Sequence, residues 1–270
     1  MPRFSANLSM LFTELPFLDR FDRAARAGFE GVEFLFPYDH PAEEVAKALQ
    51  DSGLKLVLHN LPAGHWAAGE RGIACHPDRV VEFCEGLNQA LDYARVLGTP
   101  QINCLAGILP VGVDPDQAQA TLVRNLRQAA ATLGRKGVRL LMEPINTFDI
   151  PGFFVNRTAQ AMQIMDEVGS DNLYLQYDIY HAQRMEGELS ATLQKQLPRI
   201  AHVQIADNPG RHEPGTGEIN YPHLFQWLDA IGYTGWVGCE YKPRNAQPGG
   251  TEAGLGWMHA LNASEPACAV

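Results

Sequence analysis

The feature that most constrains the fold of this chain is a regular alternation between short apolar runs and longer amphipathic segments. Eight β-rich runs follow one another along the sequence: RFSANLSMLF, GVEFLF, LKLVLHN, PQINCLA, VRLLMEPIN, LYLQYDIY, IAHVQIA and GWVGCEY. Segments with helical spacing of apolar residues separate these runs. Strands that alternate with helices are typical of a parallel sheet.

Two of the intervening segments carry clear helix boundaries. In residues 114–137, Asp114 is a good N-cap, Pro115 suits the first helical position, and Gly137 closes the segment. Residues 157–169 end in the same way at Gly169. These signals predict a helix over each segment.

The length of the chain then selects the kind of parallel sheet. A barrel of eight βα units uses about 250 residues as one domain, and this chain has 270 residues without an internal linker or low-complexity tract. We therefore expect an α/β fold, a (βα)₈ TIM barrel, as a single domain over residues 1–270. The sequence contains neither G-x-G-x-x-G in the first βα turn nor G-x-x-x-x-G-K-[ST], so no nucleotide cofactor is expected.

Composition narrows the range of partners and the cellular compartment. The chain has 31 acidic and 21 basic side chains and no run of Lys and Arg, so we expect no nucleic-acid partner. Its apolar runs are too short to span a membrane, and MPRFSANLSM does not resemble a signal peptide. The odd number of scattered cysteines predicts reduced thiols in a cytoplasmic protein; they are Cys75, Cys84, Cys104, Cys239 and Cys268.

Oxygen-bearing side chains stand at or near the carboxyl ends of the last four predicted strands. These residues are Glu143, Asp178, Gln204 and Glu240. Residues two apart on a strand share a face, and the carboxyl ends of the strands form the catalytic mouth of a TIM barrel. The sequence therefore predicts four neighbouring oxygen ligands at this mouth.

Such a cluster favours a metal ion. For a single acid, an ion pair with a neighbouring strand is the ordinary interpretation, but three buried carboxylates cannot all stay ionised without compensation. An all-oxygen site suits Mg²⁺ or Mn²⁺ and argues against zinc. We expect one divalent cation.

Other candidates have a functional and a structural interpretation. His181 could contact a substrate above the metal or cap the following helix, and Arg211 could pair with an anionic group or remain a solvated surface residue. Asp149 could contact a substrate or only initiate a turn. His59 is a further candidate for substrate binding and precedes a loop long enough to act as a lid, whereas His202 is interpreted as a core histidine.

Four motifs of the chain, LHNLPAGHWAAGERGIA, MEPIN, YDIYHAQ and HVQIADNPGRHEPGTGEINY, resemble the hydroxypyruvate isomerase family. That family belongs to the xylose-isomerase-like barrels, which also include 2-oxo-tetronate isomerases and ketose 3-epimerases. The resemblance implies a TIM barrel that interconverts hydroxypyruvate and tartronate semialdehyde (2-hydroxy-3-oxopropanoate) by metal-assisted proton transfer through an enediolate.

The resemblance also implies roles for single residues. Glu143 and Glu240 match the acid/base pair, and together with Asp178 and Gln204 they match the metal site. His181 and Arg211 match positions that contact substrate in the epimerase relatives. Those relatives usually carry His in place of Gln204, which favours the isomerase branch, and Glu in place of Asp149. A 2-oxo-tetronate isomerase, which has the same four metal ligands, and a ketose 3-epimerase acting on a neutral sugar are the alternatives.

The expected partner is a small anionic keto acid. Three carboxylates and one divalent ion leave one net negative charge, so an anionic substrate would need a cation, with Arg211 as the first candidate and Arg71 or Lys242 as weaker ones. A DNA-repair endonuclease would need a basic groove and several histidine ligands. A non-enzymatic sugar-acid binding protein would not need both glutamates. The sequence does not determine the oligomeric state, and a homo-oligomer paired through the helices is compatible with it.

Overall fold

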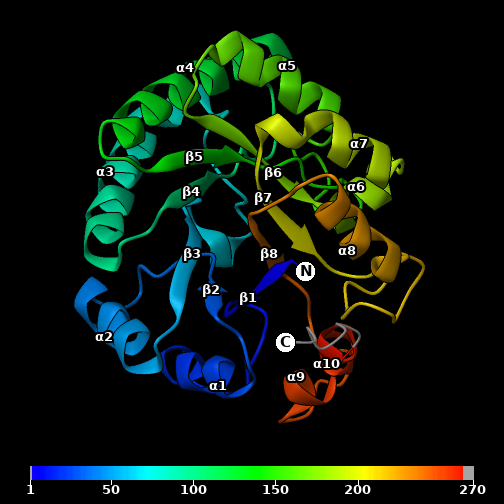
Figure 1. Cartoon of the computed structure of the whole chain (residues 1–270). Helices are drawn as coiled ribbons and strands as arrows, with labels where there is room; N and C mark the ends of the chain where they lie inside the picture. The colour runs from blue at the N-terminus through cyan, green and yellow to red at the C-terminus, as the bar shows by residue number, and fades with distance from the viewer. Residues whose placement is uncertain (1, 264–270) are drawn as a thin grey trace.

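The structure is a computed structural model that describes residues 2–263. Within this range, eight parallel strands follow one another around a closed barrel, with β1 paired to β8 (Figure 1). The strands are β1 (Arg3–Asn7), β2 (Gly31–Glu33), β3 (Lys55–Asn60), β4 (Gln101–Cys104), β5 (Arg139–Met142), β6 (Leu173–Asp178), β7 (Ile200–Ile205) and β8 (Trp236–Cys239). The predicted TIM barrel is confirmed.

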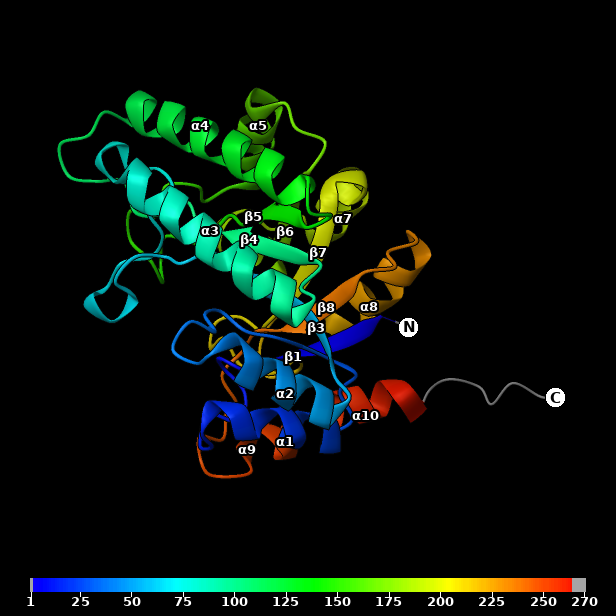
Figure 2. The ribbon, with the colours of Figure 1, turned by 90° about the vertical axis from the view of Figure 1, so that its left-hand side faces the viewer.

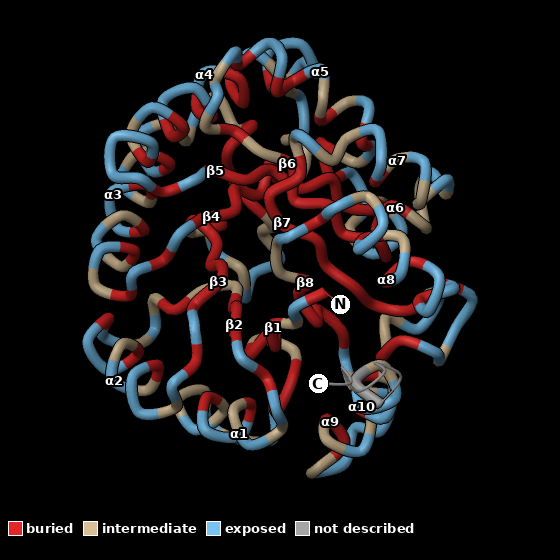
Figure 3. Tube along the Cα trace, in the orientation of Figure 1, coloured by how far each residue is buried: buried red, intermediate tan, exposed pale blue. Residues whose placement is uncertain are grey.

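Helices form a ring outside the barrel, and β6 and β8 are each followed by two of them (Figure 1). The helices are α1 (Arg20–Arg26), α2 (Ala42–Ser52), α3 (Val80–Leu97), α4 (Pro115–Gly134), α5 (Thr158–Val168), α6 (Ile179–Met185), α7 (Leu189–Gln196), α8 (Tyr221–Ala230), α9 (Gly250–Ala253) and α10 (Gly256–Ala263). The buried stretches lie mostly along the strands and on the inner faces of the helices (Figure 3). None of the helices described is both long enough and apolar enough to cross a bilayer.

The predicted helix boundaries are confirmed except at one end. The carboxylate of Asp114 caps α4 by accepting a hydrogen bond from the backbone N–H of Asp116 over 2.8 Å. However, α4 ends at Gly134, three residues before the predicted end, because the chain makes an extra turn that Gly137 closes with φ of 73°. Helix α5 ends as predicted at Gly169, whose φ is 64°.

The interior of the barrel is divided into an apolar and a polar part. Near the amino ends of the strands, a small cluster contains Val57, Leu141 and Ala201, with Tyr174 and Trp236 packed against it. Nearer the carboxyl ends, the inward side chains are polar or charged, although they are buried. The apolar side chains fill the barrel at the amino ends of the strands, and the polar groups face the catalytic mouth at the carboxyl ends.

The register of the last strands confirms the expected adjacency. Gln176 pairs with His202, Asp178 with Gln204, and Gln204 with Gly238. The loops that follow the strands lie at one end of the barrel, and β1 begins at the other end (Figure 2). Among the described cysteines, four are free thiols, namely Cys75, Cys84, Cys104 and Cys239, whereas Cys268 lies outside the described residues.

Candidate active site

A cavity of about 780 Å³ opens at the carboxyl ends of the strands. Seven of the residues singled out from the sequence line it, namely Glu143, Asp149, His181, Arg211, Glu240 and the two weaker candidate cations, Arg71 and Lys242. The other two predicted metal ligands, Asp178 and Gln204, are buried. Asp178 lies beside His181 of the cavity wall, and Gln204 is linked to Glu143 of the wall through Gln176. The fold therefore brings the predicted set together, apart from His59.

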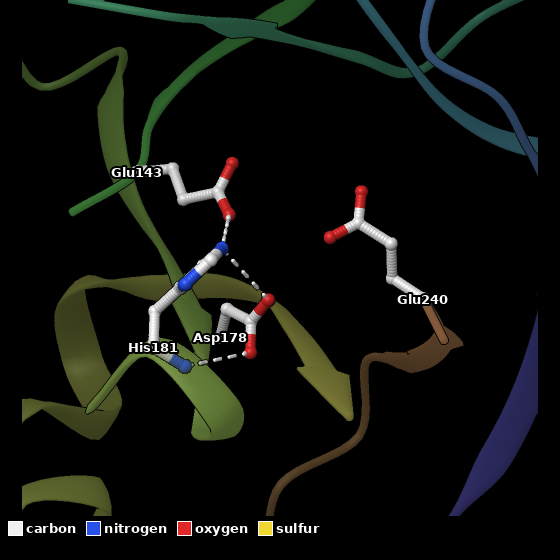
Figure 4. A group of neighbouring side chains, drawn as sticks. All are labelled: Glu143, Asp178, His181 and Glu240. Atoms are coloured by element: carbon white, nitrogen blue, oxygen red, sulfur yellow. Dashed lines mark hydrogen bonds and ion pairs between the residues drawn. The ribbon is translucent and has the colours of Figure 1, made fainter. Parts of the chain in front are cut away.

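Four ionisable side chains converge in this region (Figure 4). One potential ligand atom from each of Glu143, Asp178, His181 and Glu240 lies within 4.8 Å of the others. The Nε2 atom of His181 is 3.7 Å from Oε1 of Glu143 and 3.6 Å from Oδ2 of Asp178. Glu240 reaches the same space from the opposite side (Figure 4).

Burial and mutual repulsion change the acidity of these carboxyl groups. Burial, followed by the charges of Glu240 and Asp178, raises the pKa of Glu143 well above its usual value. Burial also raises the pKa of Asp178, and it raises the pKa of Glu240 to about 8, although Arg211 opposes the shift in both cases. The ionised forms therefore need a further positive charge in the site.

The residues present fit a divalent cation. One oxygen of Asp178, Oδ1, caps α6 by accepting hydrogen bonds from the backbone N–H groups of Tyr180 (2.7 Å) and His181 (3.3 Å). The other oxygen, Oδ2, is buried and has no hydrogen-bond partner. A buried carboxylate oxygen without a donor, next to two more carboxylates, is the environment that a hard cation such as Mg²⁺ or Mn²⁺ stabilises.

The orientation of His181 argues for a hydrogen-bond role and against metal ligation. The Oδ1 atom of Asn146 accepts from the N–H groups of Phe148 and Asp149, so its Nδ2 must face Nδ1 of His181, which is 2.6 Å away. Because Nδ1 accepts this hydrogen bond, the ring proton is on Nε2. Arg211 Nη2 lies 3.5 Å from that nitrogen but donates a much shorter hydrogen bond, of 2.8 Å, to Oε2 of Glu240. His181 thus presents an N–H donor to the cavity.

Gln204 takes part in a buried chain of hydrogen bonds that the sequence did not reveal. Its Nε2 donates to Oε1 of Glu33 over 2.8 Å, and its Oε1 accepts from Nε2 of Gln176 over 2.6 Å. Gln176 also donates to Oε2 of Glu143, over 2.9 Å. A second route from Glu33 runs through Asn7, whose Nδ2 is 3.2 Å from Glu33 and 3.3 Å from Glu240.

Glu33 is the site residue that sequence reasoning missed. It is fully buried inside the barrel, and its Oε2 accepts from Nε2 of His202 and from the hydroxyl of Ser5, each over 2.8 Å. Burial alone would raise the pKa of Glu33, but the contacts with His202, Gln204 and Ser5 outweigh it and lower the pKa. An acid inside the apolar run GVEFLF was the signal that could have found it.

A single glycine makes room for this carboxylate. A Cβ on Gly238, the β8 residue opposite Gln204, would overlap with the carboxylate oxygens of Glu33. His202 is a buried core histidine, as interpreted from the sequence, and its partner is Glu33. The carboxylate of Glu33 is therefore accommodated by the space beside Gly238 and by its contact with His202.

The loop after β7 holds Arg211 over the site. The carboxylate of Asp207 holds this loop in its conformation by accepting hydrogen bonds from the backbone N–H groups of Gly215, Gly217 and Ile219. Arg211 donates its own backbone N–H to the carbonyl of Asp207. Its Nη2 donates to Oε2 of Glu240 over 2.8 Å, so this arginine already has an anionic partner.

Asp149 and His59 have different surroundings. Asp149 lines the cavity, accepts from the hydroxyl of Tyr180 over 2.9 Å and lies 3.6 Å from Arg184. His59 is fully buried, stacks on Phe34 and is absent from the cavity wall. Burial lowers the pKa of His59 to about 3, so it is a neutral core residue, and we assign it no contact with substrate.

Comparison with known proteins places this geometry in a family. A family model described as xylose isomerase-like TIM barrel matches residues 21–261. The chain belongs to the xylose isomerase-like TIM barrel family. It is 58% identical to hydroxypyruvate isomerase of Escherichia coli over 258 residues, which cover 96% of this chain and 98% of that protein.

Two further relatives of this xylose isomerase-like barrel have other names. The chain is 49% identical to the 2-oxo-tetronate isomerase of Cupriavidus necator, with 96% of this chain and 98% of that protein covered. A crystal structure described as an AP endonuclease, family 2, from Brucella melitensis has a TM-score of 0.92 and 46% identity, with coverage of 96% of this chain and 99% of that chain. Three further curated relatives, 42–45% identical to this chain, are also isomerases by name.

Proposed function

We propose that this protein is an isomerase that interconverts hydroxypyruvate and tartronate semialdehyde in the cytoplasm, with one bound Mg²⁺ or Mn²⁺ and no nucleotide cofactor. The observation that carries the proposal is the pair of buried glutamates, Glu143 and Glu240, that face each other across the cavity. The 58% identity to the E. coli enzyme over almost the whole chain supports this substrate.

The proposed cation would be held by Glu143, Asp178, Gln204 and Glu240. When bound, it supplies positive charge that polarises the carbonyl and hydroxyl oxygens of the substrate and lowers the energy of the enediolate. Gln204 would contribute Oε1, because its Nε2 is occupied by Glu33. Asp178 would contribute Oδ2, the oxygen without a hydrogen-bond partner.

The reaction itself is a proton shift between adjacent carbons. One of the two glutamates takes a proton from C3 of hydroxypyruvate, which leaves an enediolate across C2 and C3. The glutamate pair returns a proton to C2, and the hydroxyl proton passes from the oxygen on C3 to the oxygen on C2. A placed side chain that transfers a proton typically contributes about 10²–10⁴-fold in rate.

The neighbouring side chains hold the reacting groups in place. Asn103 donates to Oε2 of Glu143 over 3.0 Å, and Arg211 donates to Oε2 of Glu240 over 2.8 Å, so each glutamate is fixed by a donor. The Nε2–H of His181 faces Glu143 and Asp178 and can donate to a substrate oxygen between them. The apolar cluster at the amino ends of the strands keeps bulk water from reaching the site through that end of the barrel.

Two alternatives follow from specific relatives. A 2-oxo-tetronate substrate would use the same chemistry and is favoured by the C. necator enzyme. Cleavage of DNA at abasic sites follows from the name given to the B. melitensis structure. The net charge of −10 weighs against that second activity, because a phosphate backbone binds to basic surfaces.

The deciding experiment compares kcat/KM of the Mg²⁺-loaded protein for hydroxypyruvate, 2-oxo-tetronate and a free ketohexose, together with cleavage of abasic-site DNA. We expect hydroxypyruvate to be the best substrate and the DNA to remain intact. A higher kcat/KM for the four-carbon acid would reassign the enzyme to 2-oxo-tetronate. A preference for the ketohexose would make it an epimerase, and DNA cleavage without isomerisation would reject the isomerase.

A further inference from the structure

We propose that Arg71, in the loop after β3, binds the carboxylate of the substrate and makes the enzyme select acids over neutral sugars. This inference rests on the proposed function, because it concerns the same cavity and the anionic part of the same substrate. Arg71 lines the cavity together with Glu143, Glu240 and Arg211.

The charges around the cavity leave few cations for a ligand. Arg211 forms an ion pair with Glu240 at 2.8 Å, and Arg184 lies 3.6 Å from Asp149. With a divalent cation bound, the three carboxylates of the site and Arg211 would be balanced. An incoming carboxylate therefore needs a positive charge outside this set.

Arg71 is the lining cation that is both unpaired and held in place. No carboxylate of the described residues lies within ion-pair distance of it. Its Nη1 donates to the carbonyls of Trp66 (3.0 Å) and Glu70 (2.7 Å), and its guanidinium carbon lies 4.1 Å from the centre of the Trp66 ring. Lys242, the other lining cation without an acidic partner among these residues, is exposed.

Because Nη1 makes both hydrogen bonds of Arg71, the edge of the guanidinium that carries Nε and Nη2 is free to bind a ligand. Within the described part of the chain, Nε and Nη2 of Arg71 have no hydrogen-bond partner. Neither atom is among the buried polar atoms that lack a partner. These two N–H groups point in parallel from one edge and match the two oxygens of a carboxylate. Because the arginine is already ordered by three contacts, little side-chain entropy remains to be lost on binding.

The backbone beside Arg71 is also fixed to the barrel. Gly72 has φ of 113°, and a Cβ there would lie 2.5 Å from the carbonyl oxygen of Leu105, just after β4. Cys75 donates its N–H to the carbonyl of Ala106 over 2.9 Å. The loop of residues 61–76 extends outward at the end of the barrel where the strands finish (Figure 2). Arg71 directly precedes Gly72, where the loop packs against the backbone of Leu105.

The test uses two ligands that differ in the carboxylate. Hydroxypyruvate is the substrate, and hydroxyacetone, which keeps the carbonyl and the hydroxyl but lacks the carboxylate, is a neutral competitor. In the Mg²⁺-loaded enzyme, Arg71→Met should raise KM for hydroxypyruvate by about ten- to a hundredfold, the range for charge-assisted hydrogen bonds, and change kcat much less. The inhibition constant of hydroxyacetone should stay the same.

Three further variants complete the experiment. Arg71→Lys keeps the positive charge but not the paired N–H donors of the guanidinium, so its KM for hydroxypyruvate should lie between those of wild type and Arg71→Met. Arg26→Met removes an exposed arginine of α1 and should behave as wild type. If Arg71→Met leaves KM unchanged while Lys242→Met raises it, or if Arg71→Met weakens hydroxyacetone equally, the inference is overturned, because the carboxylate then lies elsewhere or the loop has only lost its order.

Calorimetric binding separates this inference from the proposed function. If wild type binds hydroxypyruvate without isomerising it and Arg71→Met abolishes that binding, the proposed reaction fails and the carboxylate site stands. If wild type isomerises hydroxypyruvate and Arg71→Met binds it as tightly, only the inference about Arg71 fails. Absence of hydroxypyruvate binding to wild type rejects both.

Discussion

The amide of Gln204 on β7 donates a hydrogen bond to Oε1 of Glu33 on β2 over 2.8 Å, across the interior of the barrel. An ionised carboxylate only accepts hydrogen bonds, so Glu33 fixes Nε2 of Gln204 toward itself. The amide oxygen must then face the opposite way, toward Gln176, which also donates to Glu143. Glu33 thereby presents the oxygen that the proposed metal site needs.

This relationship predicts a strong coupling between the two residues. Gln204→Glu would place two carboxylates in contact and should lower the melting temperature and weaken Mn²⁺ binding, even though it adds a negative ligand. The exchanged pair Glu33→Gln with Gln204→Glu restores a donor and an acceptor and should recover both. Thermal unfolding and titration of Mn²⁺ by electron paramagnetic resonance measure the cycle, for which we expect a coupling of about 1–3 kcal/mol. Additive effects would show that the contact does not position Gln204.

The two glutamates are predicted to be essential for proton transfer. Glu143→Gln and Glu240→Gln keep an oxygen and nearly the same volume but remove the base, so each should lower kcat by about two orders of magnitude or more. Exchange of the C3 hydrogen of hydroxypyruvate with deuterated solvent, followed by NMR, reports the first proton transfer separately. Glu82→Gln on α3 is a control, and wild-type kcat in either cavity variant would remove that glutamate from the mechanism.

Removal of the metal should abolish activity reversibly. Chelation followed by dialysis is expected to stop the isomerisation, and addition of Mg²⁺ or Mn²⁺ should restore it, because the enediolate needs a stabilising positive charge. Metal content by mass spectrometry should approach one ion per chain in the active protein. Full activity in thoroughly metal-free protein would mean that Arg211 and His181 stabilise the enediolate without a cation.

The raised acid pKa values predict how the stability of the metal-free protein depends on pH. Burial raises the pKa of Glu240 from 4.5 to about 8, against the effect of Arg211, so the folded state holds this proton more tightly than the unfolded state. The resulting stabilisation is complete below the unfolded pKa and is lost as pH rises toward about 8. The melting temperature should therefore fall over this range.

Bound metal should reverse that trend. A divalent cation favours the ionised carboxylates, so the increase in melting temperature caused by Mg²⁺ should grow with pH, and binding should release protons. Calorimetry in two buffers with different ionisation enthalpies measures this release. An increase in melting temperature that is independent of pH would show that the carboxyl groups are already ionised in the metal-free protein.

The sequence by itself determined the barrel and the set of polar groups at its mouth. Period-two alternation assigns Glu143, Asp178, Gln204 and Glu240 to inward positions at or near strand ends, and the carboxyl ends of parallel strands necessarily meet at one end of the barrel. Local signals sufficed here because each position depends only on its own strand.

The tertiary structure decided which groups touch. Glu33 meets His202 across 169 positions of the chain, and Arg211 reaches Glu240 only because Asp207 folds the intervening loop. His59 stands on a strand like the others, yet it faces the aromatic packing outside the cavity. Contacts of this kind depend on barrel closure and loop conformation, which bring distant residues together in ways that no local pattern encodes.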